Sequence, residues 1–470
     1  MKRRDFFRNT TLASAGVAIS PMLFASSGPS EKQLDELKKQ AKNIIFLVSD
    51  GMSIGTLTMA DYFSQRKFGN GTIWMDNYKN GLFKRSMMDT ASADSLVTDS
   101  AAGGSAWGGG VRVPNGSLNI GANGENHKPI LQKFKSAGKK VGCVTTVPIT
   151  HATPASFCVN QKSRGNQPEI AEDYLRLKFD VMMGGGEEYF DGTQRKDGKD
   201  LFGSFSDNGF DVVRDRSTLK ALVDSEKPLL GVFSESALPY TVDQGSEKNL
   251  QQKIPTLSEM TKVAIEKMKS NDEGFVLQVE GGKVDWAAHA NDTGGLIFDQ
   301  VAFDDAVKVA MEFASDRDDT LVIVTTDHGN ANPGLFYGKN ADANFDRIQS
   351  FKHSNDWILK NFTKETTPSQ MIEMIEFAQG YSIQNEEAQI LHEHISGLKE
   401  SEMDNSYKLP FEKLAQIQKS YTSVGWGDMH HSADYVELAA FGPGSELLPP
   451  FVENVFLHNM MLQACGVSVK

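Results

Sequence analysis

The sequence predicts an α/β fold in which helices flank both faces of a central, mostly parallel β-sheet. Two observations lead to this prediction. Short apolar runs rich in β-branched residues, without polar alternation, are typical of strands buried on both faces. Helical stretches separate these runs along the chain, and strands that alternate with helices form parallel sheets.

Five apolar runs are expected to form strands of this sheet. Each is short and stops abruptly at glycine or at a polar residue, and they cover residues 43–51, 139–149, 179–186, 274–282 and 319–329. The intervening stretches 255–270 and 294–314 have helical patterns.

Polar residues stand at or just after the ends of four of these runs, at the point where each strand should end. They are Asp50, His151, Glu280 and Asp327. Ligands of open α/β sheets gather outside the carboxyl ends of the strands. We therefore expect these four side chains to converge in space.

The chain is expected to fold as a single domain over residues 43–470. Within it, residues 334–421 lack buried-strand patterns and are polar, with helical pieces. We interpret this segment as a helical insertion over the site, similar to a lid or crown, and not as a separate domain.

Composition and charge indicate a globular protein whose main partner is not nucleic acid. The 470 residues are 39% hydrophobic and 23% charged, as in an ordinary globular protein. A formal net charge of −13 excludes nucleic acid as the main partner, because binding to a phosphate backbone needs a basic surface. A site for an anionic ligand must therefore be made positive locally.

Residues 1–27 resemble a twin-arginine export signal. Arg3 and Arg4 are adjacent, and two phenylalanines precede a moderately apolar stretch and small residues suited to cleavage. The apolar part, 11–24, is too short for a transmembrane helix, and no later segment is long and apolar enough to span a bilayer. We expect a periplasmic or secreted protein without a membrane anchor.

Three cysteines, Cys143, Cys158 and Cys465, allow at most one disulfide within the chain. None lies in a Cys-x-x-Cys pattern, and the first two fall in apolar runs. Buried, inert thiols are therefore favoured over metal ligation. Whether Cys143 and Cys158 pair is not decided by the sequence.

Acidic residues and histidines at the strand ends indicate a metal site. Asp50 is followed by glycine, and Asp327 is followed by His328. A single acid at such a position could instead cap a helix or form a turn. Several polar strand ends in one chain favour metal ligation.

Further candidate ligands lie on a helix and in a loop. Asp285 and His289 are four residues apart, so on a helix they share one face and can chelate one ion. An ordinary ion pair on a solvated helix is the alternative. Near the C-terminus, His430 and His431 stand in a glycine-rich loop, and either could be a zinc ligand.

Ser100 is the candidate nucleophile. Small residues follow it and Asp99 precedes it, so it is expected at a helix N-terminus, where an anion such as phosphate is favoured. A simple helix cap is the alternative. A serine hydroxyl also needs activation, for which metal coordination is one route. Arg164 could clamp two phosphate oxygens, unless it is a surface arginine.

Six motifs, in this order, resemble those of the alkaline phosphatases. They are VSDGM, VTDSAA, HATPASF with an arginine beyond it, VEGGKVDWAAHA, VTTDHG and HSADYVELAAFGPG. The resemblance extends from residue 43 to residue 444, apart from the segment 334–421. It implies an alkaline phosphatase-like fold and hydrolysis of phosphate monoesters at alkaline pH.

The resemblance also implies two zinc ions with a third ion, usually magnesium, beside them. One zinc would be held by Asp285, His289 and His431, and the other by Asp50, Asp327 and His328. The ligands of the third ion would be Asp50, Thr153 and Glu280. His431 is preferred over His430 because it keeps the family's distance to the AAFGPG strand.

In the mechanism that the resemblance implies, Ser100 attacks phosphorus and forms a phosphoserine, which water then hydrolyses. Arg164 would hold the non-bridging oxygens, where charge concentrates in the transition state. Members of the family are commonly dimers, so a homodimer is expected.

Two positions depart from a well-known pattern of the family. His151 stands where some members carry aspartate near the third ion, and Trp286 stands where some carry lysine near the phosphate. Imidazole in place of carboxylate shifts the preference from magnesium towards softer divalent ions such as cobalt. His151 is therefore included among the expected metal ligands, with Co²⁺ as an alternative third ion.

Two other functions compete with this interpretation. A related two-metal phosphodiesterase or phosphonate monoesterase would use the same scaffold, although Ser100 together with Arg164 favours a dianionic monoester. A non-catalytic exported metal-binding protein would need neither of these two residues.

Overall fold

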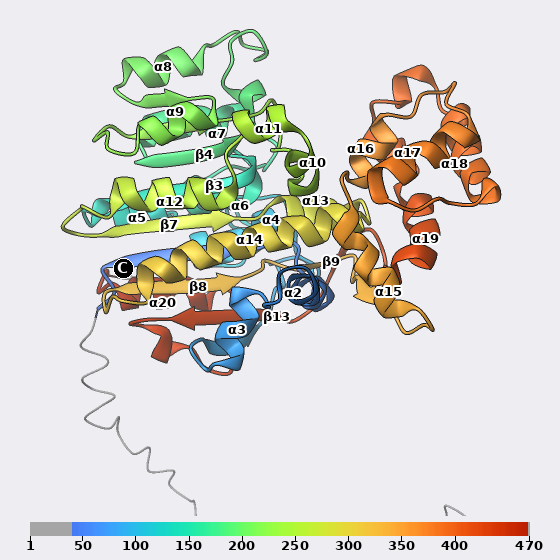
Figure 1. The fold of residues 1–470 in the computed structure, drawn as a ribbon. Coiled ribbons are helices and arrows are strands. Elements are labelled where there is room, and N and C mark those ends of the chain that lie inside the picture. The colour runs from blue at the N-terminus through green and yellow to red at the C-terminus, as the bar shows by residue number, and fades with distance from the viewer. Residues whose placement is uncertain (1–39, 469–470) are drawn as a thin grey trace, which may run out of the picture. The chain divides into compact units, whose positions relative to one another are not determined.

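A ten-stranded sheet lies at the centre of the fold (Figure 1). It is seen in a computed structural model, which describes residues 40–468. The strand order is β14-β2-β13-β8-β1-β7-β3-β4-β6-β5. The parallel part consists of β8 (Thr320–Thr325), β1 (Asn43–Val48), β7 (Phe275–Glu280), β3 (Lys140–Pro148), β4 (Val181–Gly185), β6 (Leu229–Val232) and β5 (Asp211–Val213).

Of the remaining strands, one runs antiparallel to all the others in this sheet. β13 (Val436–Phe441) pairs antiparallel with β8 and with β2 (Lys84–Met88), and β14 (Phe451–Val452) pairs parallel with β2. The central sheet is therefore mostly parallel, as predicted.

Strand β1 illustrates how the sequence forms a strand that is buried on both faces. All six of its residues are buried. Ile45 and Leu47 belong to the apolar core on one face, while Ile44, Phe46 and Val48 belong to the core on the other face. Successive side chains point to opposite faces of a strand, so each face needs its own cover.

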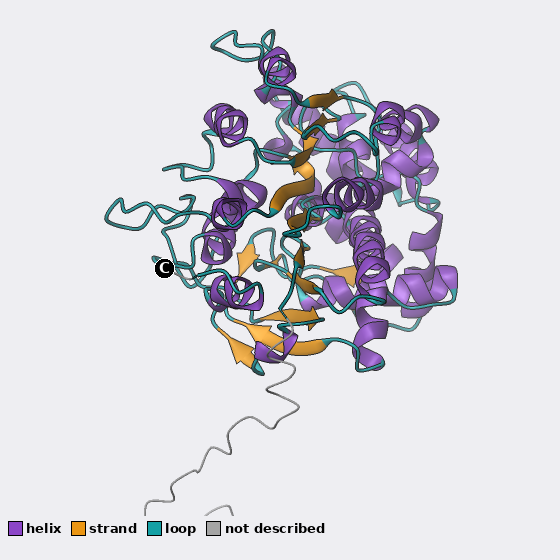
Figure 2. Cartoon of the chain, turned by 90° about the vertical axis from the view of Figure 1, so that its left-hand side faces the viewer, coloured by secondary structure: helices purple, strands orange, loops and turns teal. Residues whose placement is uncertain are grey.

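Helices supply this cover on both sides of the strands (Figure 2). One core is completed by α2 (Ile54–Phe68), α3 (Ile73–Lys79), α12 (Leu257–Met268) and α14 (Thr293–Ala314). The other is completed by α4 (Ser100–Gly108), α5 (Ile130–Ser136), α6 (Ala152–Cys158), α7 (Gln167–Leu177), α8 (Leu201–Asp207) and α20 (Phe456–Ala464). The predicted sheet with helices on both faces is confirmed.

Shorter elements complete the connections between the strands. They are the helices α9 (Arg216–Ala221), α10 (Thr241–Ser246), α11 (Lys248–Lys253) and α13 (Lys283–His289), with 3₁₀ turns at Glu187–Tyr189 and Ser445–Leu447. Asp292 caps the start of the long helix α14. Its carboxylate accepts a hydrogen bond from the backbone N–H of Gly295 at 2.9 Å.

Residues 334–421 are helical. They contain α15 (Ala341–Asp346), α16 (Asn355–Lys360), α17 (Pro368–Gln379), α18 (Asn385–Gly397) and α19 (Phe411–Thr422), with 3₁₀ turns at Arg347–Ser350, Glu400–Glu402 and Ser406–Lys408. The two ends of the segment lie next to each other, because β10 (Gly334–Leu335) pairs antiparallel with β11 (Val424–Gly425). Its role as an insertion over the site stays a prediction.

Buried hydrogen bonds hold these helices together and attach them to α14. The side chains of Asn355, Gln379 and Gln418 are linked by bonds of 2.7–2.9 Å. The carboxylate of Asp292, at the start of α14, accepts the backbone N–H of Asn355 at 2.6 Å. Since these groups are buried, each bond also satisfies a polar atom that water cannot reach.

The thiols of Cys143 and Cys158 are buried and lie 3.7 Å apart, and neither forms a disulfide here. Burial raises the pKa of the Cys143 thiol, which keeps it protonated. Within residues 40–468, the structure has no helix that is long and apolar enough to cross a membrane. The predicted export signal, residues 1–27, lies outside the described residues.

Asp304 on α14 gives the stability of the fold a testable pH dependence. Its carboxylate accepts the backbone N–H groups of Ile73, at 2.6 Å, and of Trp74, at 3.0 Å, at the start of α3. Burial raises its pKa to about 7, whereas the pKa of an unperturbed aspartate is about 3.9. The folded chain thus binds this proton more tightly, and its contribution to stability is present at low pH and lost as the pH rises through about 7.

We expect Asp304→Asn to lower the free energy of unfolding by about 1–3 kcal/mol at pH 5, because one backbone N–H loses its acceptor. The loss should be smaller at pH 8, where the wild-type carboxylate is charged. Chemical denaturation at both pH values measures it. An equal loss at pH 5 and pH 8 would contradict the raised pKa.

Candidate active site

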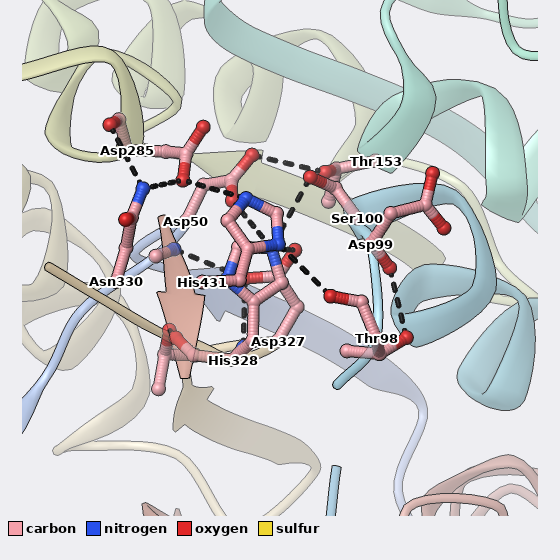
Figure 3. Close-up of polar contacts among 12 residues, drawn as sticks. Asp50, Thr98, Asp99, Ser100, Thr153, Asp285, Asp327, His328, Asn330 and His431 are labelled. Atoms are coloured by element: carbon pink, nitrogen blue, oxygen red, sulfur yellow. Dashed lines mark hydrogen bonds and ion pairs between the residues drawn. The ribbon is translucent and has the colours of Figure 1, made fainter. Parts of the chain in front are cut away.

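The carboxyl ends of four neighbouring strands place three acidic side chains and one histidine of the site. Asp50 follows β1, Glu280 ends β7, Asp327 follows β8, and His151 lies just beyond β3. These strands are adjacent in the order β8-β1-β7-β3, so their ends share one edge of the sheet. Figure 3 shows Asp50 and Asp327 together with Ser100, Asp285 and His431, which come from other parts of the chain.

One group of candidate ligands consists of Asp285, His289 and His431, whose ligand atoms lie within 4.8 Å of one another. Nε2 of His289 lies 3.0 Å from Nε2 of His431. The Nδ1 atoms of these rings are 2.7 Å and 2.9 Å from the backbone carbonyl oxygens of Met429 and Thr98. Because a carbonyl only accepts, each Nδ1 carries the hydrogen, and both Nε2 atoms face the group with their lone pairs when neutral.

A short strand pair brings His431 to this group. β12 (His431–Ser432) pairs antiparallel with β9 (Gly329–Asn330), which directly follows His328. Burial lowers the pKa of His431, but contact with Asp285 outweighs it and raises the pKa to about 9. His430, in contrast, is 84% exposed in its side chain and pairs with Asp428. Of the two histidines, the structure therefore places His431 in the group.

A second group consists of Asp50, Asp327 and His328, which are fully buried. Nε2 of His328 lies 3.3 Å from Oδ2 of Asp327 and 3.6 Å from Oδ1 of Asp50. Both of these oxygens are without a hydrogen-bond partner among residues 40–468. Burial and the neighbouring carboxylates raise the pKa of Asp50, and those causes also raise the pKa of Asp327, to about 6. Buried carboxylate oxygens without a partner call for a cation.

The two groups are not separate, because Asp285 lies between them. Its carboxylate is also within 4.8 Å of ligand atoms of Asp50 and His328. Asn330 holds it there by donating a hydrogen bond of 2.7 Å to Oδ1. Asn330 was not among the residues predicted from the sequence, although its position two residues after His328 in a polar loop was a signal.

A third group consists of Asp50, His151 and Glu280. Thr153 donates a hydrogen bond to Asp50 at 3.3 Å, and Thr145 donates one to Glu280. Oε1 of Glu280 and Nδ1 of His151 are buried and unpartnered in the described part of the chain. Burial raises the pKa of Glu280 to about 7. Thr145 was missed from the sequence because it lies inside a strand and not at its end.

The ring of His151 contacts a charged residue, Arg164, and an aromatic residue, Trp286. Arg164 donates a hydrogen bond to its Nε2 at 3.1 Å, and the ring of Trp286 packs edge-on against it with 6.1 Å between centroids. Burial, followed by the charge of Arg164, lowers the pKa of His151 to about 3. Its imidazole is therefore neutral at physiological pH, as a metal ligand must be.

Ser100 is the first residue of α4 and is buried. Asp99 caps this helix by accepting the backbone N–H of Ala102 at 2.9 Å. Oγ of Ser100 lies 3.3 Å from Nε2 of His328, so the hydroxyl adjoins the second group. The helix dipole places positive potential at this position, which favours an anion.

Small residues allow α4 to approach α6 closely enough to set this geometry. A Cβ atom on Gly104 would lie 2.3 Å from Oγ of Ser156, and one on Gly108 would lie 2.0 Å from the Ser156 carbonyl oxygen. Neither distance is sterically allowed, so glycine is required at both positions for this packing.

Arg164 reaches the site from the loop that follows α6. Its guanidinium donates a hydrogen bond to Oδ2 of Asp99 at 2.9 Å as well as to His151. The Arg164 side chain is 29% exposed, so part of the fork remains accessible to a ligand. Arg164 therefore contacts two residues of the site and is not a surface arginine remote from the other candidates.

Comparisons with known proteins point in one direction. A family model described as "Alkaline phosphatase" matches residues 41–467. Alkaline phosphatase 4 of Bacillus subtilis is 30% identical, over 98% of this chain and 99% of that protein. The alkaline phosphatase of Escherichia coli is 31% identical, over 68% of this chain and 78% of that protein.

Solved structures agree with this result. The crystal structure of Thermus thermophilus alkaline phosphatase has a TM-score of 0.84 and 31% identity, and the match covers 92% of this chain and 93% of that one. A mutant of the alkaline phosphatase TAB5, described with Mg bound in its M3 site, has a TM-score of 0.66 and 27% identity, over 92% and 99% of the two chains.

Proposed function

The chain belongs to the alkaline phosphatase family of phosphomonoesterases, and on this premise we propose that it hydrolyses phosphate monoesters at alkaline pH through a phosphoserine on Ser100. The observation that carries the proposal is the position of the Ser100 hydroxyl. The hydroxyl lies at a helix N-terminus, next to buried carboxylates without partners and near a guanidinium.

The donor sets fit the metal ions that such a function implies. We propose that one zinc ion is held by Asp285, His289 and His431, and a second by Asp50, Asp327 and His328. Carboxylates with neutral imidazoles suit zinc. When bound, the two ions would lower the pKa of the Ser100 hydroxyl and stabilise negative charge on the departing oxygen.

We assign a third ion to Asp50, Thr153 and Glu280, with His151 beside it. The TAB5 mutant described with Mg in its M3 site carries glutamate in place of a histidine, so it supports magnesium where carboxylates surround the third ion. The imidazole of His151 favours softer ions such as cobalt. Metal analysis of the untreated enzyme separates the two, and a full complement of magnesium would argue against cobalt.

The side chains of this protein then account for the individual steps. Oγ of Ser100 attacks phosphorus in line with the leaving oxygen, and the bond to that oxygen breaks, giving a phosphoserine and an alcohol. Water attacks the phosphoserine from the vacated side and releases phosphate, which restores the serine. The positive end of α4 and the guanidinium of Arg164 stabilise the non-bridging oxygens throughout.

Hydrolysis of p-nitrophenyl phosphate and of its bis ester tests the proposal. The monoester should be turned over far faster than the diester, and chelation should abolish the activity until zinc and magnesium are added back. Faster turnover of the bis ester, or of a phosphonate monoester, would favour the related two-metal hydrolases instead. Activity that survives complete chelation would contradict the metal assignment.

Arg164→Ala should lower kcat/KM for p-nitrophenyl phosphate by roughly 10- to 100-fold, because charge-assisted hydrogen bonds to the phosphoryl oxygens are lost. Arg164→Lys should recover only part of the loss, since an ammonium lacks the planar fork. Steady-state kinetics and inhibition by inorganic phosphate measure both variants. Full recovery by lysine would mean that a point charge suffices.

We also propose that the protein is exported to the periplasm or secreted, and that it forms a homodimer. Export rests on the twin-arginine pattern of residues 1–27. Fractionation of cells that express the full chain tests export, and light scattering of the purified protein tests the dimer.

A further inference from the structure

A polar pocket of about 310 Å³ lies beside the candidate active site. One wall is helix α19, the last helix of the segment 334–421, and the other is the loop 425–430. Trp426 of this loop is half-buried and lines the pocket, and Gln416 of α19 lines it as well. Apart from Asn291, the pocket is therefore built by these two parts of the chain, neither of which holds a residue of the three ligand groups.

The pocket shares its wall with the group formed by Asp285, His289 and His431. The carbonyl oxygen of Met429, a lining residue, accepts the hydrogen bond from Nδ1 of His289. Asn291, another lining residue, comes two residues after His289, and His430 directly precedes His431. A ligand in the pocket would thus lie one layer of residues away from this group.

A row of imidazole rings leads from the nucleophile to the pocket. Ser100 contacts His328, whose ring stacks on that of His431 with 3.7 Å between centroids. The ring of His289 follows, 4.9 Å further along. In-line displacement requires the leaving oxygen to depart on the side of phosphorus opposite the attacking oxygen. The alcohol portion of a monoester therefore leaves on the side of phosphorus away from Ser100, and we assign to it the path along the row of rings, past His289 to the neighbouring pocket.

The side chains of the pocket define the kind of alcohol that fits. Trp426 offers an aromatic surface, on which the C–H face of a ring can pack. Around it stand the carboxylates of Glu412 and Asp428, the amide of Gln416 and the ammonium of Lys419, which together donate and accept several hydrogen bonds. The lining has two carboxylates, one of them paired with His430, and one ammonium. This balance does not favour a leaving group that carries further negative charge.

We propose that this pocket binds the alcohol portion of the substrate and favours a polyhydroxylated, sugar-like alcohol. The inference rests on the proposed monoesterase function and adds the substrate class to it. Trp426 and Gln416 act as specificity-determining residues, since they contact the part of the substrate that does not react.

Comparison of two substrates tests this inference in the metal-loaded enzyme. Trp426→Ala should lower kcat/KM for glucose 6-phosphate by about tenfold, mainly through a higher KM, as the loss of one aromatic contact implies. For ethyl phosphate, which is too small to reach the pocket, the change should stay below about twofold. Gln416→Ala, on an exposed face of α19, should show the same selectivity with a smaller effect.

Tyr407→Ala is the matched control, because Tyr407 is an aromatic residue of the same segment that is fully exposed and does not line the pocket. This variant should leave kcat/KM unchanged for both substrates. Calorimetric binding of glucose 6-phosphate to Ser100→Ala, with and without Trp426→Ala, gives a readout without turnover, and the double variant should bind more weakly.

Equal loss for both substrates in the Trp426 and Gln416 variants, or no loss for either, would overturn the inference. A wild-type enzyme that hydrolyses no monoester at all would instead overturn the proposed function. The two failures are therefore distinguishable.

Discussion

Replacement of Ser100 by alanine is expected to lower kcat for phosphate monoesters by roughly 10⁴-fold or more, because the attacking oxygen is removed. The hydroxyl lies 3.3 Å from Nε2 of His328, at the N-terminus of α4. Water would have to attack phosphorus directly, without a phosphoserine. Steady-state kinetics with p-nitrophenyl phosphate measures the loss, and metal content should stay unchanged because Ser100 is not an assigned protein ligand.

Ser105→Ala is the control for this experiment. Ser105 lies on the same helix and is equally buried, but its hydroxyl accepts the backbone N–H of Asn119 at 3.0 Å and does not reach the site. This variant should lose about 1 kcal/mol of stability and keep nearly full kcat. A comparable kcat for the Ser100 and Ser105 variants would show that the helix, and not the nucleophile, had been tested.

Replacement of His431 by alanine is expected to have the second-largest effect. It removes an imidazole whose Nε2 lies 3.0 Å from that of His289, so zinc should be lost from this group. Loss of a group that merely supports a ligand costs about 10- to 100-fold in activity or metal affinity, and loss of the ligand itself should cost more. Mass spectrometry of bound metals and kinetics at limiting and excess zinc measure the two quantities.

His430 provides the matched variant at the adjacent position. Its side chain is 84% exposed and pairs with Asp428 outside the group. His430→Ala should therefore retain the zinc content and kcat of the wild type for a small substrate such as ethyl phosphate. If the His430 variant lost zinc and the His431 variant did not, the assignment of the ligand would be reversed.

Five of the seven parallel strands were predicted, because the pattern of a doubly buried strand is local, whereas β5 and β6 were not among the expected runs. Runs such as 43–48 are apolar at every position, and each residue contributes to one of the two cores. The antiparallel pairing of β13 with β2 and β8 was not predictable, because an apolar run is equally compatible with either direction. The two-residue pairing of β12 with β9 is shorter than any periodic pattern.

The candidate site, too, has a part that the local sequence pattern predicts and a part that it does not. The positions of Asp50 and Asp327 follow from strand ends, and the spacing of Asp285 and His289 follows from one helical turn. Their mutual placement depends on tertiary contacts that spacing cannot specify. Asn330, which orients Asp285 through a bond of 2.7 Å, and Thr145, which contacts Glu280, are examples.

The choice between His430 and His431 shows this limit most clearly. Both residues are histidines in the same loop, so composition and local pattern treat them alike. The pairing of β12 with β9 turns one ring towards His328 and leaves the other in solvent. From the sequence, only the resemblance to a family favoured His431.

Identification of the phosphorylated residue during turnover tests the central claim most directly. The enzyme is mixed with substrate, quenched with acid to slow hydrolysis of the intermediate, digested and mapped by mass spectrometry. We predict that the peptide containing Ser100 gains the mass of one phosphate on that serine, and that the Ser100→Ala variant gains none. Phosphate on a different residue, or wild-type turnover in the Ser100→Ala variant, would contradict the account.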